Sequence, residues 1–241
     1  CFARFQAKKM MDLASLLPSL TPEQRMQLEQ LAEVFLSWNQ KLNLSSIRDR
    51  QGVLIKHIVD SLLIVQWDLI HEGQKIMDLG TGGGFPGLPL AITYPNTDFT
   101  LVDATGKKIR VVEAMVKELR LKNVQCVTGR AEELGRKHSF RERFHVVLTR
   151  ALAEFPVLLE YAMPFVKIGG KLIAYQGQEL AENWSGFQPV AKKLSSKISE
   201  VKHAILPVED AERSFVIVEK IGPLSAKYPR GIGIPKKHPL S

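Results

Sequence analysis

The sequence predicts an α/β protein built on one seven-stranded sheet, with helices on both faces and a helical layer in front of it. From Lys75 onward, short apolar, β-rich runs alternate with amphipathic stretches, which is the pattern of βα units. Two strand-like runs follow each other near the end of the chain, and none precedes residue 75. These features indicate five βα units followed by a pair of strands.

The helical layer is expected over residues 11–72, after a non-structural extension at 1–10. Thr21 and Gln24 have the spacing of a capping box, with proline in the first turn between them. Apolar residues then recur every three or four positions up to Leu42, which predicts a long helix. We expect its apolar stripe to pack in the core.

A second helix should follow, with an apolar stripe made of Ile55, Ile58, Leu62 and Val65. Its residues His57, Asp60 and Ser61 stand at i, i+3 and i+4, so they share a face and can hydrogen-bond. We expect His57 and Asp60 to tie the helical layer to the core rather than to perform acid–base chemistry.

The sheet domain is assigned to residues 73–222. Its strands are expected at 75–79, 98–102, 124–127, 144–149, 171–175, 201–208 and 214–221. The clearest helices between them are expected at 106–121 and 154–166. Residues 223–241 are assigned to a basic, proline-rich tail.

The most informative segment of the chain follows the first predicted strand. An apolar run ends in Asp78 and turns into a loop that contains Gly80, Gly82, Gly83 and Gly84. Such a loop lies at the carboxyl edge of a sheet, where α/β proteins bind nucleotides. Because glycine has no Cβ atom, the backbone here can approach a ligand closely.

The chemistry of this loop favours one ligand over another. Residues 82–87 match the dinucleotide pattern G-x-G-x-x-G, so a nicotinamide-dependent oxidoreductase is one alternative. Asp78, however, can receive a cationic amine, and Pro86 removes a backbone N–H that would cradle a pyrophosphate. A ligand with an ammonium group, a sulfonium and an adenosine but no phosphate fits better, and S-adenosylmethionine is such a ligand.

Asp103 ends the second predicted strand, 23 residues after Gly80. An acid at this position can accept hydrogen bonds from both ribose hydroxyls of an adenosine. The same side chain is also placed to cap the helix that begins near Gly106.

The composition favours a polyanionic partner and a reducing compartment. The net charge is +8, and the last 22 residues contain five Lys or Arg and no acid. A second basic cluster lies on the helix predicted after the second strand. The two cysteines form neither a disulfide framework nor a metal site, and no apolar run approaches 18 residues. We therefore expect a cytoplasmic protein without a membrane span.

Several motifs resemble one family. They are Trp38-Asn39 with Asn43-Leu44, His57 to Ser61, Asp78 to Gly87, Thr149 to Ala153, and Lys227 to Gly231 with Pro235 to Lys237. The chain resembles, over nearly everything after Met10, the glucose-inhibited division protein B family of bacterial small-subunit (16S) ribosomal RNA guanine-N7 methyltransferases. The resemblance implies a Rossmann-like, S-adenosylmethionine-dependent methyltransferase sheet. It also implies small-subunit ribosomal RNA, or an assembling 30S particle, as partner.

The resemblance also implies cofactor contacts. They fall on Gly80, Phe85, Asp103, Ala104, Thr105, Ala131, Glu132 and Arg150. Asp78, Gly82 and Gly84, chosen from the loop chemistry, complete the predicted cofactor-binding set. Arg150 can pair with the cofactor carboxylate or with an RNA phosphate, and no catalytic base is assigned.

The chemistry absent from the sequence agrees with methylation at N7. The chain has no Pro-Pro pair of the kind that holds an exocyclic amine, and Cys126 lies inside a predicted strand rather than beside an acceptor. No cluster with metal-ligand spacing is found either. The N7 lone pair of guanine needs no prior deprotonation, so alignment of the reactants can suffice. A cofactor-sensing RNA-binding protein is the non-enzymatic alternative.

Overall fold

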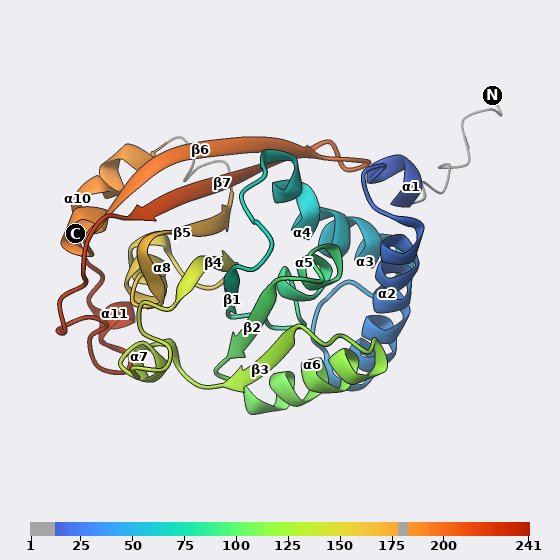
Figure 1. Ribbon diagram of the computed structural model, residues 1–241, viewed down its shortest axis with the longest axis horizontal. Helices are drawn as coiled ribbons and strands as arrows, with labels where there is room; N and C mark the ends of the chain where they lie inside the picture. Colours follow the sequence, from blue (N-terminus) through green and yellow to red (C-terminus); the bar gives the residue numbers. More distant parts are fainter. Residues whose placement is uncertain (1–12, 178–182) are drawn as a thin grey trace, which may run out of the picture.

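The computed structural model describes residues 13–177 and 183–241, so the predicted extension at 1–10 lies outside it. Seven strands form one sheet in the order β3-β2-β1-β4-β5-β7-β6 (Figure 1). The strands are β1 (Lys75–Leu79), β2 (Asp98–Asp103), β3 (Val124–Thr128), β4 (Phe144–Arg150), β5 (Val166–Gln176), β6 (Ser196–Leu206) and β7 (Ala211–Lys220). The predicted α/β class with seven strands is confirmed.

The sheet has a point at which its strand order reverses. β1 pairs in parallel with β2 on one side and with β4 on the other, whereas β7 pairs antiparallel with both β5 and β6. The connections that leave β1 and β4 therefore run in opposite directions across the sheet. In such sheets the crevice outside the carboxyl ends of these strands binds ligands.

The helices cover both faces of the sheet. They are α1 (Leu13–Leu16), α2 (Pro22–Leu42), α3 (Arg50–Val53), α4 (Asp60–Leu62), α5 (Gly87–Thr93), α6 (Gly106–Glu118), α7 (Ala131–Leu134), α8 (Phe155–Ala162), α10 (Gln188–Lys193) and α11 (Ile234–Lys237). A π-helical turn at Leu54–Val59 joins α3 to α4, so the predicted second helix is continuous but irregular. A 3-10 turn at Leu63–Trp67 follows α4, and another at Trp184–Phe187 precedes α10.

The core has two parts because successive strand residues point to opposite faces of the sheet. Ile76 of β1 faces a cluster shared with α2, α5 and α6, while the next residue, Met77, faces a cluster shared with α8 and α10. The capping box of α2 is formed, since the Gln24 N–H donates to Thr21 Oγ1 at 3.2 Å and the Thr21 N–H donates to Gln24 Oε1 at 2.9 Å. The predicted apolar stripe of α2 lies in the first cluster.

Several predicted boundaries differ from the structure. The helix predicted at 154–166 ends at Ala162, the strand predicted at 201–208 ends at Leu206, and the strand predicted at 214–221 begins at Ala211. The helix predicted to reach residue 121 ends at Glu118, and Arg120 takes a left-handed φ of 55°. β5 begins at Val166 rather than at residue 171, because Val166 already pairs with Phe144 of β4. Gly169 and Gly170 follow within the same strand. β6 begins at Ser196 rather than at residue 201, because Ser196 already pairs with Lys220 of β7.

The tail at 223–241 packs against the sheet domain. Leu224 and Tyr228 are buried in the second cluster. Arg141 donates hydrogen bonds to the backbone carbonyls of both residues, at 2.9 and 2.8 Å. The division of the chain into a helical layer, a sheet domain and a tail stays a prediction, but these contacts anchor the tail to the domain.

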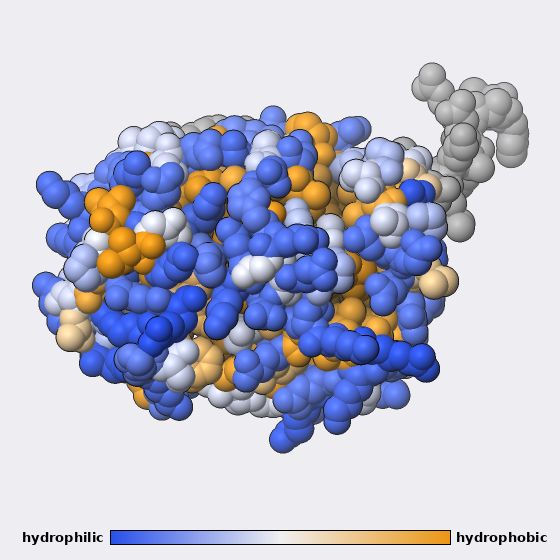
Figure 2. All heavy atoms as spheres, viewed as in Figure 1, coloured by the Kyte–Doolittle hydropathy of each residue, from blue (hydrophilic) through white to orange (hydrophobic). Residues whose placement is uncertain are grey.

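The face shown in Figure 2 is mostly hydrophilic, with hydrophobic residues in small separate patches. Within 13–177 and 183–241, no helix has the length and apolar character that a bilayer span requires.

Candidate active site

Three glycines of the loop after β1 have left-handed backbone conformations. The φ angles of Gly80, Gly82 and Gly84 are 81°, 57° and 95°, a region that favours glycine. A Cβ atom on Gly80 would lie 2.5 Å from Leu152 Cδ1, and one on Gly84 would lie 2.4 Å from Leu88 Cδ1. A Cβ on Gly82 would have no neighbour nearer than 3.9 Å. Gly82 is therefore the glycine that faces open space.

Asp78 lies beneath this loop rather than on a pocket wall. Its side chain is 0% exposed, and its Oδ2 atom accepts hydrogen bonds from the Thr81 hydroxyl at 2.6 Å and from the Gly87 N–H at 2.8 Å. Burial raises the pKa of this carboxyl to about 6. The Oδ1 atom is buried without a hydrogen-bond partner in the described part of the chain, so it is the oxygen left for the predicted amine contact.

Asp103 connects the loop after β1 to the loop after β2. Its Oδ2 accepts the Gly82 N–H at 3.0 Å and its Oδ1 accepts the Thr105 N–H at 2.8 Å. The prediction that Asp103 caps the following helix is wrong, because the N-cap residue of α6 is Thr105. Since each carboxylate oxygen has further acceptor capacity, contact with a ribose remains open to Asp103.

Two pockets meet at the carboxyl ends of β1 and β2. Both are lined by Gly80, Asp103 and Leu152. The larger has a volume of about 400 Å³ and the smaller about 130 Å³. A hollow of about 660 Å³ lies elsewhere, at the amino ends of the strands, and contains none of the predicted site residues.

The predicted cofactor residues divide between the two pockets. The larger is lined by Gly80, Gly82, Phe85, Asp103 and Arg150. The smaller is lined by Gly80, Asp103, Ala104, Ala131 and Glu132. Asp78, Gly84 and Thr105 line neither pocket. Asp78 accepts a hydrogen bond from the Gly87 N–H at the start of α5, and Gly84 packs against Leu88.

The N-terminal helical layer supplies a wall of the larger pocket that the sequence analysis missed. Its contributions are Phe35, Leu44, Ser45 and His57, and Lys108 of α6 adds a cation to the lining. The spacing of His57 with Asp60 indicated a shared helix face. Local pattern could not show that this face meets the carboxyl edge of the sheet.

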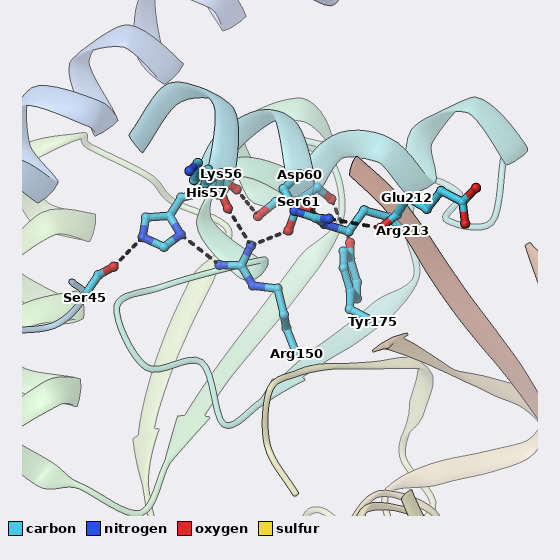
Figure 3. Close-up of polar contacts among 9 residues, drawn as sticks. All are labelled: Ser45, Lys56, His57, Asp60, Ser61, Arg150, Tyr175, Glu212 and Arg213. Carbon is cyan, nitrogen blue, oxygen red and sulfur yellow. Dashed lines mark hydrogen bonds and ion pairs between the residues drawn. The ribbon is translucent and has the colours of Figure 1, made fainter. Parts of the chain in front are cut away.

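Arg150, at the end of β4, is held by a network of polar contacts (Figure 3). Its Nη1 donates to Asp60 Oδ2 at 2.9 Å, and the other oxygen of Asp60 accepts the Nε–H of Arg213, on β7, at 2.5 Å. The Arg150 guanidinium also lies 5.7 Å from the centre of the Phe85 ring. Asp60 thus ties the helical layer to two strands, as predicted, while contact of Arg150 with a cofactor or a phosphate stays a prediction.

His57 is an uncharged side chain in this setting. Its ring stacks on Phe85 with centres 4.7 Å apart and an angle of 18° between the planes. Burial, and then the nearby charge of Arg150, lower its pKa to about 4. Near neutral pH the imidazole is therefore neutral, which agrees with a structural rather than an acidic role.

The tail supports the smaller pocket from behind. Glu132 is buried, and its Oε1 atom accepts the Gly233 N–H at 3.0 Å. Gly233 immediately precedes α11, so the end of the chain is hydrogen-bonded to a predicted cofactor residue.

Across the described ranges, no group of three or more His, Cys, Asp or Glu is placed to hold a metal ion.

The sheet order, the glycine loop after β1, the acid that ends β2 and the antiparallel β7 define a Rossmann-like α/β fold. TYW2 of M. jannaschii, solved in complex with AdoMet, shares this fold with a TM-score of 0.55 and 14% identity, covering 73% of this chain and 80% of its own.

Sequence comparison gives the family. The model of rRNA small subunit methyltransferase G matches residues 24–214. The chain is 38% identical over 208 residues to the ribosomal RNA small subunit methyltransferase G of Alkaliphilus metalliredigens, covering 86% of this chain and 87% of the relative. The protein of that name from Thermoanaerobacter pseudethanolicus is 40% identical over 207 residues, 86% of each chain. The chain belongs to the rRNA small subunit methyltransferase G family.

Proposed function

We propose that this protein transfers the methyl group of S-adenosylmethionine to N7 of one guanosine in small-subunit ribosomal RNA. The observation that carries the proposal is the pair of pockets that meet at Asp103 and Gly80, within a chain of this family. One pocket suits an adenosine and the other suits a methionine with an acceptor base beside it. Relatives named for methylation of small-subunit ribosomal RNA support the choice of substrate.

The residues fit this cofactor. Ala104, Ala131 and Glu132 would hold the adenine in the smaller pocket, and Asp103 would accept the ribose hydroxyls between the two pockets. Gly82 would let the methionine part pass close to the backbone, because the space beside its Cα is open. The unpartnered Oδ1 of Asp78 is the acceptor that we assign to the ammonium group, although Asp78 lies behind the loop and lines neither pocket. When bound, the cofactor supplies an electrophilic methyl group on a sulfonium.

The protein's own contribution to catalysis is alignment. His57 is neutral and already engaged with Arg150 and Ser45, so the pocket presents no free general base there. Guanine N7 needs none, because its lone pair is available at neutral pH. The pocket residues then act by holding N7, the methyl carbon and the sulfur in line, which is catalysis by proximity and orientation.

The RNA must present the guanine outside a paired helix, because the deep groove of A-form RNA closes N7 to side chains. Lys108 in the pocket lining and the exposed Lys236 and Lys237 of the tail would contact phosphates. We place the protein in the cytoplasm with ribosomal RNA or the assembling 30S particle as its substrate.

A methyl-transfer assay tests the proposal. Purified protein, tritiated S-adenosylmethionine and small-subunit RNA lacking the modification are combined, once as naked RNA and once as 30S particles. Label on N7 of one guanosine supports the proposal, and label on N1, N2 or a ribose refutes it. Stabilisation in a thermal shift by nicotinamide cofactors rather than S-adenosylhomocysteine would favour the oxidoreductase alternative. RNA binding without turnover would favour the RNA-binding alternative.

A further inference from the structure

Ser45 lies on the pocket wall that comes from the helical layer, and its position is tightly held. The side chain of Asn39, which is 1% exposed, accepts the Ser45 N–H at 2.8 Å. It also donates to the carbonyl oxygens of Ser45 and Ile47, at 3.0 and 2.8 Å. A buried amide thus clamps the loop between α2 and α3, so the Ser45 hydroxyl is presented to the larger pocket from a rigid backbone.

The direction of the hydrogen bond between His57 and Ser45 follows from Arg150. A guanidinium has only donors, so the contact between Arg150 Nη2 and His57 Nδ1, at 3.4 Å, makes Nδ1 an acceptor. The imidazole is neutral, since its pKa is lowered to about 4. We therefore assign its proton to Nε2, which lies 2.9 Å from Ser45 Oγ and acts as the donor to it.

The Ser45 hydroxyl is left as a donor. Its oxygen accepts hydrogen bonds from His57 Nε2–H and from the Ile47 N–H, the latter at 3.2 Å. A serine oxygen has two lone pairs and one proton, so both acceptor positions are taken. In residues 13–177 and 183–241, no acceptor receives the remaining proton. The chain of contacts from Asp60 through Arg150 and His57 thus ends in an O–H that lines the pocket (Figure 3).

We propose that the Ser45 hydroxyl donates a hydrogen bond to O6 of the target guanine and so selects guanine over adenine. This inference rests on the proposed function and deepens it. The edge of guanine that carries N7 presents two neighbouring acceptors, N7 and O6, whereas adenine presents N7 beside an amino donor. A fixed donor next to the methyl-transfer position pairs with O6 and opposes the adenine amino group. A site built to pair with a substrate oxygen discriminates against bases that lack it.

The test compares bases that differ only at this contact. Ribosomal RNA is prepared with guanosine, inosine or 2-aminopurine riboside at the methylated position, naked or in particles, whichever form the wild-type protein methylates. Inosine keeps O6 and lacks the 2-amino group, while 2-aminopurine keeps the 2-amino group and lacks O6. The measurement is kcat/KM for each base with the wild-type protein, Ser45→Ala and Ser45→Thr. Ser46→Ala, an exposed neighbour outside the pocket lining, is the matched control.

Intrinsic N7 reactivity differs between these bases but is the same for every variant, so the change in the guanosine to 2-aminopurine ratio isolates the contact. We expect Ser45→Ala to reduce this ratio roughly tenfold, the worth of one neutral hydrogen bond in a pocket. The guanosine to inosine ratio should not change. Ser45→Thr and Ser46→Ala should keep the wild-type ratio, and Ser45→Cys, a weaker donor of similar size, should lower it.

Two results would overturn the inference while leaving the proposed function in place. One is an equal loss of activity by Ser45→Ala on guanosine and 2-aminopurine. The other is weaker binding of S-adenosylhomocysteine by Ser45→Ala with an unchanged base ratio, which would assign the hydroxyl to the cofactor carboxylate. Failure of the wild-type protein to methylate any guanosine would instead refute the proposed function.

Discussion

Arg230 in the tail forms an ion pair with Glu160 on α8. Because the carboxylate is buried, the loss of stability expected on breaking this pair can be calculated. The Glu160 side chain is 0% exposed and the Arg230 side chain is 26% exposed. Arg230 donates from its backbone N–H at 2.8 Å and from its Nε and Nη2 atoms at 2.9 and 2.6 Å. These hydrogen bonds with Glu160 raise the pKa of Arg230. Arg230→Ala would leave the carboxylate buried with only a backbone donor.

Removing one partner of a buried ion pair costs about 3–5 kcal/mol, because an uncompensated charge remains. For a chain of this length each kcal/mol lowers the melting temperature by about 2–4 °C, so we expect a loss of roughly 6–20 °C. The assay is urea and thermal unfolding followed by circular dichroism. Arg230→Ala combined with Glu160→Gln should lose less than Arg230→Ala alone, since the double variant buries no unpaired charge.

Lys236→Ala is the control, because this side chain is exposed and its removal should change stability by no more than about 0.5 kcal/mol. A loss below about 1 kcal/mol for Arg230→Ala would refute the reasoning. It would mean that the tail is held weakly and that Arg230 is free for another partner, such as RNA.

Three more predictions concern the tail, the glycine loop after β1 and the carboxyl group beneath that loop. Ending the chain after Ser225 removes the Gly233 N–H that holds Glu132. Both the melting temperature and the calorimetric affinity for S-adenosylhomocysteine should therefore fall. Unchanged affinity would show that the tail does not support the cofactor pocket. Gly82→Val puts a β-branched residue at a φ of 57°, which costs roughly 1–2 kcal/mol, and fills open space. We therefore expect affinity for S-adenosylhomocysteine to drop about tenfold or more with the fold retained, and wild-type affinity would show that the cofactor lies elsewhere. Burial raises the pKa of Asp78 from 3.8 to about 6, so the folded state holds this proton more tightly than the unfolded chain. Stability in urea should consequently fall as the pH rises from about 4 to about 6, and Asp78→Asn should show a shallower fall; identical pH profiles would contradict this.

The stretches whose structure is set by local rules were predictable from the sequence. β1 is buried from Ile76 to Leu79 and carries apolar side chains there except for Asp78, and the loop after it needs residues that tolerate positive φ. The capping box of α2 depends on Thr21 and Gln24, three residues apart. The strand pattern also predicted that Asp103 and Arg150 lie at the carboxyl edge of the sheet, because parallel strands end at one edge. The assignment of Ala131 and Arg150 to the cofactor came from the family resemblance instead.

Local patterns were less informative at the ends of elements. β5 begins five residues before its expected start because Val166 pairs with Phe144, a contact between strands that no window of sequence contains. The helix α6 stops at Glu118 although its apolar period continues. Such boundaries depend on where a neighbouring strand or helix ends.

By itself, the sequence determined the order of strands and helices, the glycine loop and the family, because each depends on residues near one another in the chain. Only the tertiary structure decided that Asp78 lies under the loop, that Ser45 and His57 face the pocket, and that the tail packs on the domain. These outcomes depend on contacts such as Asp60 with Arg150, 90 residues apart, and Glu160 with Arg230, 70 residues apart. Burial and hydrogen bonding between distant segments set the direction of a side chain, and neither is encoded in its neighbours along the chain.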